Sequence, residues 1–348
     1  MTDDRPRKRD LVRSLLDDDT SAIVLTQPEV LAWYLEGARV TIALGGPPIV
    51  AVRVTAVDET IFCFDNEHWR MVTEELPREI DVRSVPWFES LEAAAGVGSP
   101  ATVTDRDQAS ALREARRTLL PFERERYRRL CVDSAMLLTD VLSEARPEHT
   151  ERAVAAGLAA AVVGIGADPL VTLVAGEPRL PHRHPVPTGG VIGRRAMAVI
   201  CARRHGLIAN VSRWITFGEP TPLERDTEHR ILDVEAAAFD ATKPGRALGD
   251  VLVDIAAAYG AAGFDRDEWR RHHQGGPTGY AGRDPRAIPG GAEVVAAGQA
   301  FAWNPTAPGA KVEDTVIIDD SGVHVLSVDP RWPTVEVAGL ARPLSWQH

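Results

Sequence analysis

The sequence predicts an α+β protein with a small α/β domain followed by a larger domain of helices and sheet. Over residues 10–91, short runs rich in Val and Ile alternate with helical or turn segments, which is the pattern of a small α/β domain. From Pro121 onward, long amphipathic helices are followed by strand-like runs. At 348 residues the chain is long enough for two domains. We place the boundary near residue 112, so the predicted domains cover residues 1–112 and 113–348.

Four short runs are the predicted strands of the first domain. They are rich in β-branched and aromatic residues, and turn or helix-forming segments separate them. The runs cover residues 22–25, 40–44, 49–54 and 60–64. A stretch rich in Gly, Ser and Pro at residues 95–100 then interrupts the pattern, since these residues favour turns.

The second domain contains a weak internal duplication. Residues 123–145 have helical spacing and continue through Pro147 into a second helical segment, and residues 226–241 continue in the same way through Pro244. Strand-like runs follow each unit. A true repeat would make the domain pseudo-symmetric. The other explanation is that two helices joined by a proline turn are common in unrelated folds.

Composition excludes several classes of partner. A net charge of −11 argues against nucleic acid, because phosphate binding requires a basic face. The chain lacks a run of about 18 apolar residues, as a membrane-spanning helix would need, and its N-terminus does not lead into a signal-peptide core. The three cysteines are far apart and show no C-x-x-C spacing, so we expect reduced, buried thiols. We therefore expect a cytoplasmic protein.

The order and spacing of several segments resemble the pita-bread family of creatinase, aminopeptidase P, prolidase and methionine aminopeptidase. Residues 197–214 have the frame of the strand pair that carries metal ligands in that family. Residues 27–37 stand in place of the segment of Asn, Tyr, Leu, Thr and Gly in its smaller N-terminal domain. The resemblance extends over about residues 10–335. It implies a pita-bread C-terminal domain, a creatinase-like N-terminal α/β domain and a homodimer.

The resemblance also implies that most of the family's metal ligands are missing. The metallopeptidases of the family bind two divalent ions through two Asp, one His and two Glu. The matching positions here are Val199, Asn210, Gly276, Asn304 and Glu313. Hard cations need several anionic oxygens to offset their dehydration, and a single carboxylate does not supply them. We therefore predict no metal and no other cofactor, and the metal-activated hydroxide of the peptidases is lost with the metal.

Histidines are the candidates for chemistry without metal, since creatinase works without metal through a histidine. His182 and His184 lie in a Pro-rich segment where the family has a substrate-gripping histidine, and the spacing does not choose between them. An imidazole titrates near neutrality and can act as general acid or base. Either residue could instead cap the loop. His272 and His273, at the end of a predicted helix, are further candidates, and His273 is a candidate substrate contact. Paired histidines at a helix end are often only solvated or dipole partners.

The remaining candidates would hold a substrate. Arg213 matches the family position after the second Asp, and a guanidinium can grip a carboxylate with two hydrogen bonds; an ion pair with Glu313 or another carboxylate explains it equally well. Glu313 is a candidate base or ammonium anchor, and Asn210 and Asn304 are candidate polar contacts. Three aromatic residues flank the lost ligand positions, where they would wall the pocket or simply pack in the core: Trp214, Trp303 and Tyr280.

Two classes of function follow from this pattern. The first is a metal-independent, creatinase-like hydrolase or lyase that cleaves a C–N bond of a small amine, amide or amidine bearing a carboxylate. The alternative is a non-catalytic pita-bread pseudo-peptidase that binds a peptide or small ligand. Fold alone does not decide between them, because one fold hosts many functions.

Overall fold

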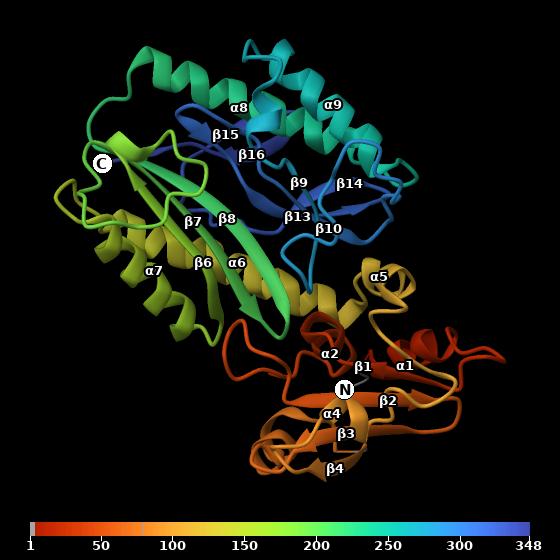
Figure 1. Ribbon diagram of the computed structural model, residues 1–348. Coiled ribbons are helices and arrows are strands. Elements are labelled where there is room, and N and C mark those ends of the chain that lie inside the picture. Colours follow the sequence, from red (N-terminus) through yellow and green to blue (C-terminus); the bar gives the residue numbers. More distant parts are fainter. Residues whose placement is uncertain (1–3, 79) are drawn as a thin grey trace. The chain divides into compact units, whose positions relative to one another are not determined.

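The computed structural model describes residues 4–78 and 80–348 (Figure 1). Its contacts divide the chain into two compact units. The first runs to Arg124 and includes His205–Leu207, and the second holds Glu125–Arg204 and Ile208–His348. The predicted boundary near residue 112 lies within α5 (Ala109–Arg117) and remains a prediction.

The first unit is built on a mixed five-stranded sheet of order β4-β3-β2-β1-β5. Strand β1 lies between β2 and β5, pairs antiparallel with β2 and parallel with β5, and has all four of its side chains buried. The strands are β1 (Ala22–Leu25), β2 (Val50–Thr55), β3 (Glu59–Phe64), β4 (Asp81–Val85) and β5 (Thr102–Thr104). The helices are α1 (Arg5–Arg13), α2 (Pro28–Tyr34), α3 (His68–Arg70), η1 (Met71–Glu75), α4 (Leu91–Ala94) and α5.

Three of the four predicted strands are confirmed, and the prediction for residues 40–44 is wrong. Thr41 forms an isolated bridge to Pro48, and residues 42–46 are bends and turns. The Gly-Gly-Pro-Pro sequence at 45–48 explains this result, since proline lacks the N–H that a ladder requires and glycine weakens a strand. Ile42 is accordingly 63% exposed.

A buried lysine ties together segments of the first unit that are distant in sequence. The Nζ atom of Lys8 lies 2.6 Å from Glu36 Oε1 and 2.7 Å from Glu123 Oε1, and it donates to Trp33 O at 2.8 Å. The Lys8 side chain is fully buried. A buried ammonium is tolerated only when paired in this way.

The second unit contains two similar halves, each a helix pair followed by strands. The first half has α6 (Pro121–Ser143), α7 (Glu151–Gly164), β6 (Asp168–Gly176), η2 (Glu177–Arg179), β7 (Arg195–Arg204) and β8 (Leu207–Thr216). The second half has α8 (Pro222–Ala241), α9 (Leu248–Ala261), η3 (Glu268–Arg271), β9 (Gly275–Thr278), β10 (Gln299–Trp303), β11 (Thr306–Ala307), β12 (Ala310–Lys311), β13 (Asp314–Asp319) and β14 (Gly322–Val325). The chain ends in β15 (Thr334–Val337), β16 (Leu340–Pro343) and β17 (Trp346–Gln347). The repeated order of elements agrees with the predicted duplication.

Local sequence signals set the helix starts of the second unit. The predicted helix over 226–241 begins earlier, at Pro222, because Thr221 and Glu224 form a reciprocal capping box. Thr150 caps α7 in a similar way, accepting a hydrogen bond from Ala153 N. Both caps follow from residue types that can be read in the sequence.

Two four-stranded sheets, β17-β8-β7-β6 and β14-β13-β10-β9, meet along β8. Asn210 N donates to Thr315 Oγ1 at 2.8 Å, and Ser212 N donates to Glu313 O at 2.9 Å. Figure 1 shows β8 running beside β13, with α6 and α7 covering the first sheet and α8 and α9 covering the second. Every side chain of β8 is buried. Because these positions are buried, the polar groups of β8 and of the segment before β13 form hydrogen bonds with each other.

The expectation of buried thiols is confirmed for Cys63 and Cys131 and is wrong for Cys201, which is only partly buried. Cys63, Cys131 and Cys201 are unpaired thiols, the first two of them buried. Burial raises the pKa of the Cys63 thiol to about 12, so this thiol stays protonated near neutrality. Across residues 4–78 and 80–348, none of the helices combines the length and apolar character that a bilayer crossing requires.

Candidate functional site

Glu313 lies at the centre of a buried group of charges where β8 meets β13. Its carboxylate is 2.5 Å from Arg283 NH2 and 3.2 Å from Lys311 Nζ. Burial alone raises the pKa of a carboxyl group, but the two adjacent cations outweigh burial and lower the pKa of Glu313 to about 2. Glu313 is therefore ionised near neutrality and is a weak proton acceptor.

Asn210 completes this group, which we call the charged centre (Asn210, Arg283, Lys311 and Glu313). Its Oδ1 atom accepts from Arg283 NH1 at 3.1 Å and lies 3.2 Å from the Cys201 thiol. Its Nδ2 group donates to Thr278 Oγ1 at 3.1 Å and to Ile208 O at 3.2 Å. Arg283 thus bridges Asn210 and Glu313, and the polar atoms of Asn210 are occupied within the chain.

Sequence reasoning did not single out Arg283 or Lys311. For Lys311 a signal was present, because it stands two positions before Glu313 in the same segment, and such residues share a face when the backbone is extended. Arg283 lies in an irregular segment after β9, where no periodicity places its side chain. Its position depends on the tertiary fold.

The positions matched to the other metal ligands have different surroundings. Val199 packs with Leu173, Met197 and Trp214 in an apolar cluster. Gly276 has φ +142°, and a Cβ atom there would lie 2.7 Å from Pro285 O. No side chain fits at Gly276 without movement of the backbone. A ligand histidine at this position is sterically excluded.

These residues do not fit a dinuclear metal centre. Glu313 is already neutralised by Arg283 and Lys311, and two divalent ions in their place would require several further carboxylates. Within the part of the chain that the structure describes, the one group of three or more His, Cys, Asp or Glu side chains close enough to share a metal ion is His184, His272 and His273. That group contains no carboxylate.

We call these three residues the imidazole cluster. His184 Nε2 lies 3.1 Å from His272 Nε2. The His273 ring stacks on His272 with centroids 4.4 Å apart and is 5.9 Å from the His184 ring. His184 is exposed, His272 is buried and His273 is intermediate. The structure therefore brings together three of the four histidines considered from sequence, whereas His182 is exposed outside the cluster.

A buried glutamate ties together the two segments that carry the imidazoles. His184 lies in the loop after η2, and His272 and His273 follow η3. One carboxylate oxygen of Glu268 pairs with Arg183, next to His184, and the other is 2.7 Å from Arg271 NH1. The Glu268 side chain is only 2% exposed. Since buried charged hydrogen bonds are strong and directional, this contact fixes the loop of His184 against the end of η3.

The surroundings hold all three imidazoles neutral at pH 7. Burial, and then the charge of Lys311, lower the pKa of His272 to about 2. Burial followed by Arg283 and Arg286 lowers the pKa of His273 to about 4. The pKa of His184 is also lowered, by the partial desolvation of its ring and then by the charge of Lys311. Neutral imidazoles carry a free lone pair, so the cluster offers proton acceptors and metal ligands.

The hydrogen bonds of Thr306 assign the tautomer of His272. The Thr306 hydroxyl donates to Asn304 O at 2.9 Å, so its oxygen is left to accept from His272 Nδ1 at 3.5 Å. The proton of His272 is then on Nδ1, and the Nε2 atom facing His184 carries the lone pair. His184 Nε2–H donates to that lone pair, which leaves His184 Nδ1 as its basic nitrogen.

Asn304 lies beside the cluster with an unused acceptor. Its backbone N donates to Gln274 O at 3.0 Å, which places it opposite the residue after His273. The side chain is 2% exposed, and its Oδ1 atom has no hydrogen-bond partner among residues 4–78 and 80–348. An unsatisfied buried acceptor is costly. A ligand N–H would remove this cost.

Arg213 is bound within the protein. Its NH2 group lies 3.0 Å from Asp314 Oδ1 and donates to Ser327 O at 3.0 Å, and its NH1 group donates to Ser212 O at 2.7 Å. The side chain is 4% exposed. This arrangement corresponds to the ion-pair explanation with another carboxylate, and its role as a substrate clamp remains a prediction.

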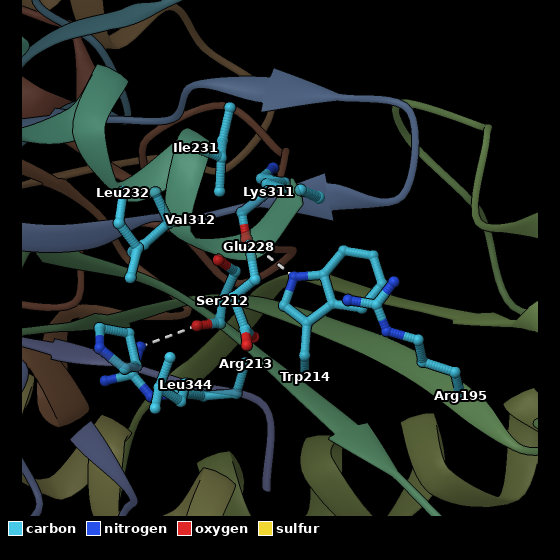
Figure 2. Close-up of a pocket in the computed structure, with 12 residues that line it drawn as sticks. Arg195, Ser212, Arg213, Trp214, Glu228, Ile231, Leu232, Lys311, Val312 and Leu344 are labelled. Carbon is cyan, nitrogen blue, oxygen red and sulfur yellow. Dashed lines mark hydrogen bonds between the residues drawn. The ribbon is translucent and has the colours of Figure 1, made fainter. Parts of the chain in front are cut away.

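The three candidate aromatic residues are buried. Trp303 is fully buried in the core beneath α8 and α9 and donates from Nε1 to Thr242 Oγ1 at 3.0 Å. Figure 2 shows Trp214 at a small cavity together with Arg213 and Arg195, its Nε1 atom donating to Lys311 O at 2.7 Å. This cavity measures about 10 Å³, which is enough for about one water molecule. Tyr280 is 6% exposed, and substrate contacts of these residues remain predictions.

Comparisons with known proteins place the chain in a family. The model of metallopeptidase family M24 matches residues 125–320, so the chain belongs to this family of hydrolases. No curated protein matches the chain in a sequence comparison.

Solved structures with this fold include prolidases and aminopeptidases. The prolidase from Pyrococcus horikoshii OT3 has a TM-score of 0.76 at 18% identity and covers 93% of this chain and 99% of its own. The Xaa-Pro dipeptidase from Bacillus anthracis has a TM-score of 0.74 at 16% identity, covering 94% and 98%. The X-Pro aminopeptidase from Thermotoga maritima MSB8 has a TM-score of 0.75 at 15% identity, covering 93% and 98%. The predicted pita-bread fold and its N-terminal domain are confirmed.

Proposed function

We propose that the chain is a metal-independent hydrolase or lyase that cleaves a C–N bond of a small, carboxylate-bearing amine, amide or amidine. The observation that carries this proposal is the imidazole cluster, in which an exposed neutral histidine is hydrogen-bonded to a second histidine. The charged centre supports it, because Arg283 and Lys311 pair with Glu313 and so take the electrostatic role that cations have in the metallopeptidases.

In the hydrolytic reaction, His184 acts as the general base. Its Nδ1 atom removes a proton from the attacking water, and the Nε2–H bond to His272 holds the imidazole in place. The water oxygen forms a bond to carbon, the C–N bond breaks, and the proton on His184 passes to the leaving nitrogen. Asn304 Oδ1 accepts from an N–H of the substrate, because this acceptor is buried without a partner in the described residues.

The proposed cation for the substrate carboxylate is Arg286. Its charge acts on both His184 and His273, and its side chain is exposed. Arg213 is instead paired with Asp314. Glu313 serves in this proposal as the anchor of Arg283 and Lys311, since its low pKa makes it a poor base.

The test is turnover of a panel of dipeptides, N-acyl amino acids and guanidino acids in the presence of a chelator. We expect His184→Gln to lower kcat about 10²- to 10⁴-fold, the usual contribution of a general base. Arg286→Ala should mainly raise KM. His229→Gln is the matched control, because His229 lies on the exposed face of α8. Full activity of His184→Gln, or loss of wild-type turnover with the chelator, would contradict the proposal.

A second candidate function is a non-catalytic module that binds a peptide or small ligand. The packing of Val199 against Trp214 and the lack of space at Gly276 favour it, because they close the volume where a metal and its water would lie. Absence of turnover across the panel, together with saturable binding of a peptide by calorimetry, would support this function over the first. A cytoplasmic homodimer is the assembly that we propose for either function, by resemblance to the family.

A further inference from the structure

We propose that His184, His272 and His273 form a binding site for a single late first-row transition metal ion, with Zn²⁺ as the representative ion. Its ligands are three histidine side chains, whereas a dinuclear centre of the family type uses mainly carboxylates. It uses nitrogen donors from two segments, the loop after η2 and the residues that follow η3.

The spacing of the nitrogen atoms fits such an ion. Two imidazole nitrogens that bind one tetrahedral Zn²⁺ at 2.0–2.1 Å lie about 3.4 Å apart, and the Nε2 atoms of His184 and His272 are 3.1 Å apart. The ligand atoms of all three residues lie within 4.8 Å of one another. A turn of the His273 ring toward this pair completes a three-nitrogen set, which leaves a fourth position for water or another ligand.

The hydrogen bonds around the cluster leave the lone pair of His272 Nε2 free, and His184 offers its Nε2 lone pair once its proton moves from Nε2 to Nδ1 on metal binding. His272 Nδ1 is directed to Thr306 Oγ1, so its Nε2 atom is unprotonated and faces His184. A second hydrogen bond of this kind usually orients a metal-binding histidine. His273 Nδ1 is buried and has no hydrogen-bond partner in the described part of the chain. A metal ion would satisfy this nitrogen.

The backbone around the site is pre-arranged and open to solvent on one side. The Glu268 carboxylate holds Arg183 and Arg271 and so fixes the two ligand-bearing segments against each other. His184 is exposed, while His272 is buried. An ion can therefore enter past His184. Binding then loses less conformational entropy, because the folded protein already holds the ligand-bearing segments in place.

The nearby charges determine which ions are accepted. The charges of Lys311 and Arg286 act on His184 and would repel a bound cation, while the charge of Glu313 would attract it. Mg²⁺, Mn²⁺ and Ca²⁺ need anionic oxygens to offset this repulsion, whereas Zn²⁺, Ni²⁺ and Cu²⁺ form strong bonds to neutral imidazole. The site should thus bind Zn²⁺ and reject Mg²⁺.

Binding would also affect the proposed activity, a consequence that rests on the proposed function. The ion takes the His184 and His272 nitrogens that form the proton-transfer pair, so Zn²⁺ should inhibit turnover and a chelator should restore it. A metallopeptidase would show the opposite response. Metal binding itself is measured without substrate, so its failure is distinguishable from failure of the proposed function.

The test is isothermal titration of the full-length, metal-free protein with ZnCl₂ and separately with MgCl₂. We expect one Zn²⁺ per chain and no heat with Mg²⁺. His184→Gln should weaken Zn²⁺ binding at least about 10- to 100-fold, since even the loss of an outer hydrogen-bond partner has an effect of that size. His182→Gln, two residues away in the same loop and also exposed, is the matched control and should bind like wild type.

A thermal melt of each variant checks folding, and His273→Gln provides a second variant from the other segment. Addition of Zn²⁺ should raise the Tm of wild type and His182→Gln but not that of His184→Gln or His273→Gln. Absence of Zn²⁺ binding by wild type would overturn the proposal. Equal Zn²⁺ affinity of wild type and His184→Gln would overturn it as well.

Discussion

Replacing Glu313 with glutamine tests how the charged centre is held together. The variant keeps the size of the side chain and removes the charge that neutralises Arg283 and Lys311, whose side chains are 9% and 3% exposed. Leaving buried charges without their partner costs about 3–5 kcal/mol. The lowering of the Glu313 pKa from 4.5 to about 2 gives a similar figure of about 3 kcal/mol.

The pH dependence has a definite sign. A carboxyl group whose pKa is lowered by folding stabilises the native state fully above its unfolded pKa of about 4.5. This contribution is lost as the pH falls from about 4.5 toward 2, because the unfolded chain takes up the proton first. The difference in stability between wild type and Glu313→Gln should therefore shrink over this range.

The assay is urea denaturation at pH 7 and at several lower pH values, followed by circular dichroism. Glu336→Gln, which alters an exposed side chain on β15, is the control and should remain within about 0.5 kcal/mol of wild type. The double variant Glu313→Gln with Lys311→Met should recover part of the loss, since it removes one of the two unpaired cations. A stability of Glu313→Gln equal to that of wild type at pH 7 would refute this reasoning.

Three further substitutions test other parts of the structure by the same denaturation measurement. Lys8→Met should destabilise the first unit by about 3–5 kcal/mol, because it leaves Glu36 and Glu123 without their buried cation; a change below about 1 kcal/mol would argue against that pairing. Thr221→Ala should cost about 1 kcal/mol through loss of the α8 cap, with Thr221→Ser close to wild type. Gly276→Ala should cost more than about 1 kcal/mol, because its φ is +142° and the new Cβ would meet Pro285 O; a neutral effect would show that a side chain fits there.

Much of the architecture could be predicted from local patterns. The alternation of short strands in the first unit, the helix pairs around Pro147 and Pro244, and the caps at Thr150 and Thr221 depend on residues close together in sequence. Periodicity and capping are local, so the chain displays them without knowledge of the fold. Residues 40–44 contain β-branched residues and yet form no strand, because the Gly-Gly-Pro-Pro sequence that follows cannot continue a ladder.

The site was predictable only in part. The absence of carboxylates at Val199, Asn210 and Gly276 is a property of the sequence alone, as is the retention of Glu313. The sequence alone could not predict that His184 and not His182 belongs to the imidazole cluster. Both residues fit the same motif, and only the loop conformation distinguishes them. An irregular loop lacks the regular periodicity of a helix or strand, so the sequence does not indicate in which direction its side chains point.

The sequence by itself determined the order of elements, the two-part organisation and the absence of carboxylates at Val199, Asn210 and Gly276, since these follow from residue type and spacing along the chain. Tertiary structure decided which charges surround Glu313. Arg283 and Lys311 converge on Glu313, and His184 meets His272 from a segment 88 residues away. Such contacts lower the free energy only after the sheets and loops have packed, because buried charges and imidazoles are stable only beside the partners that folding brings to them.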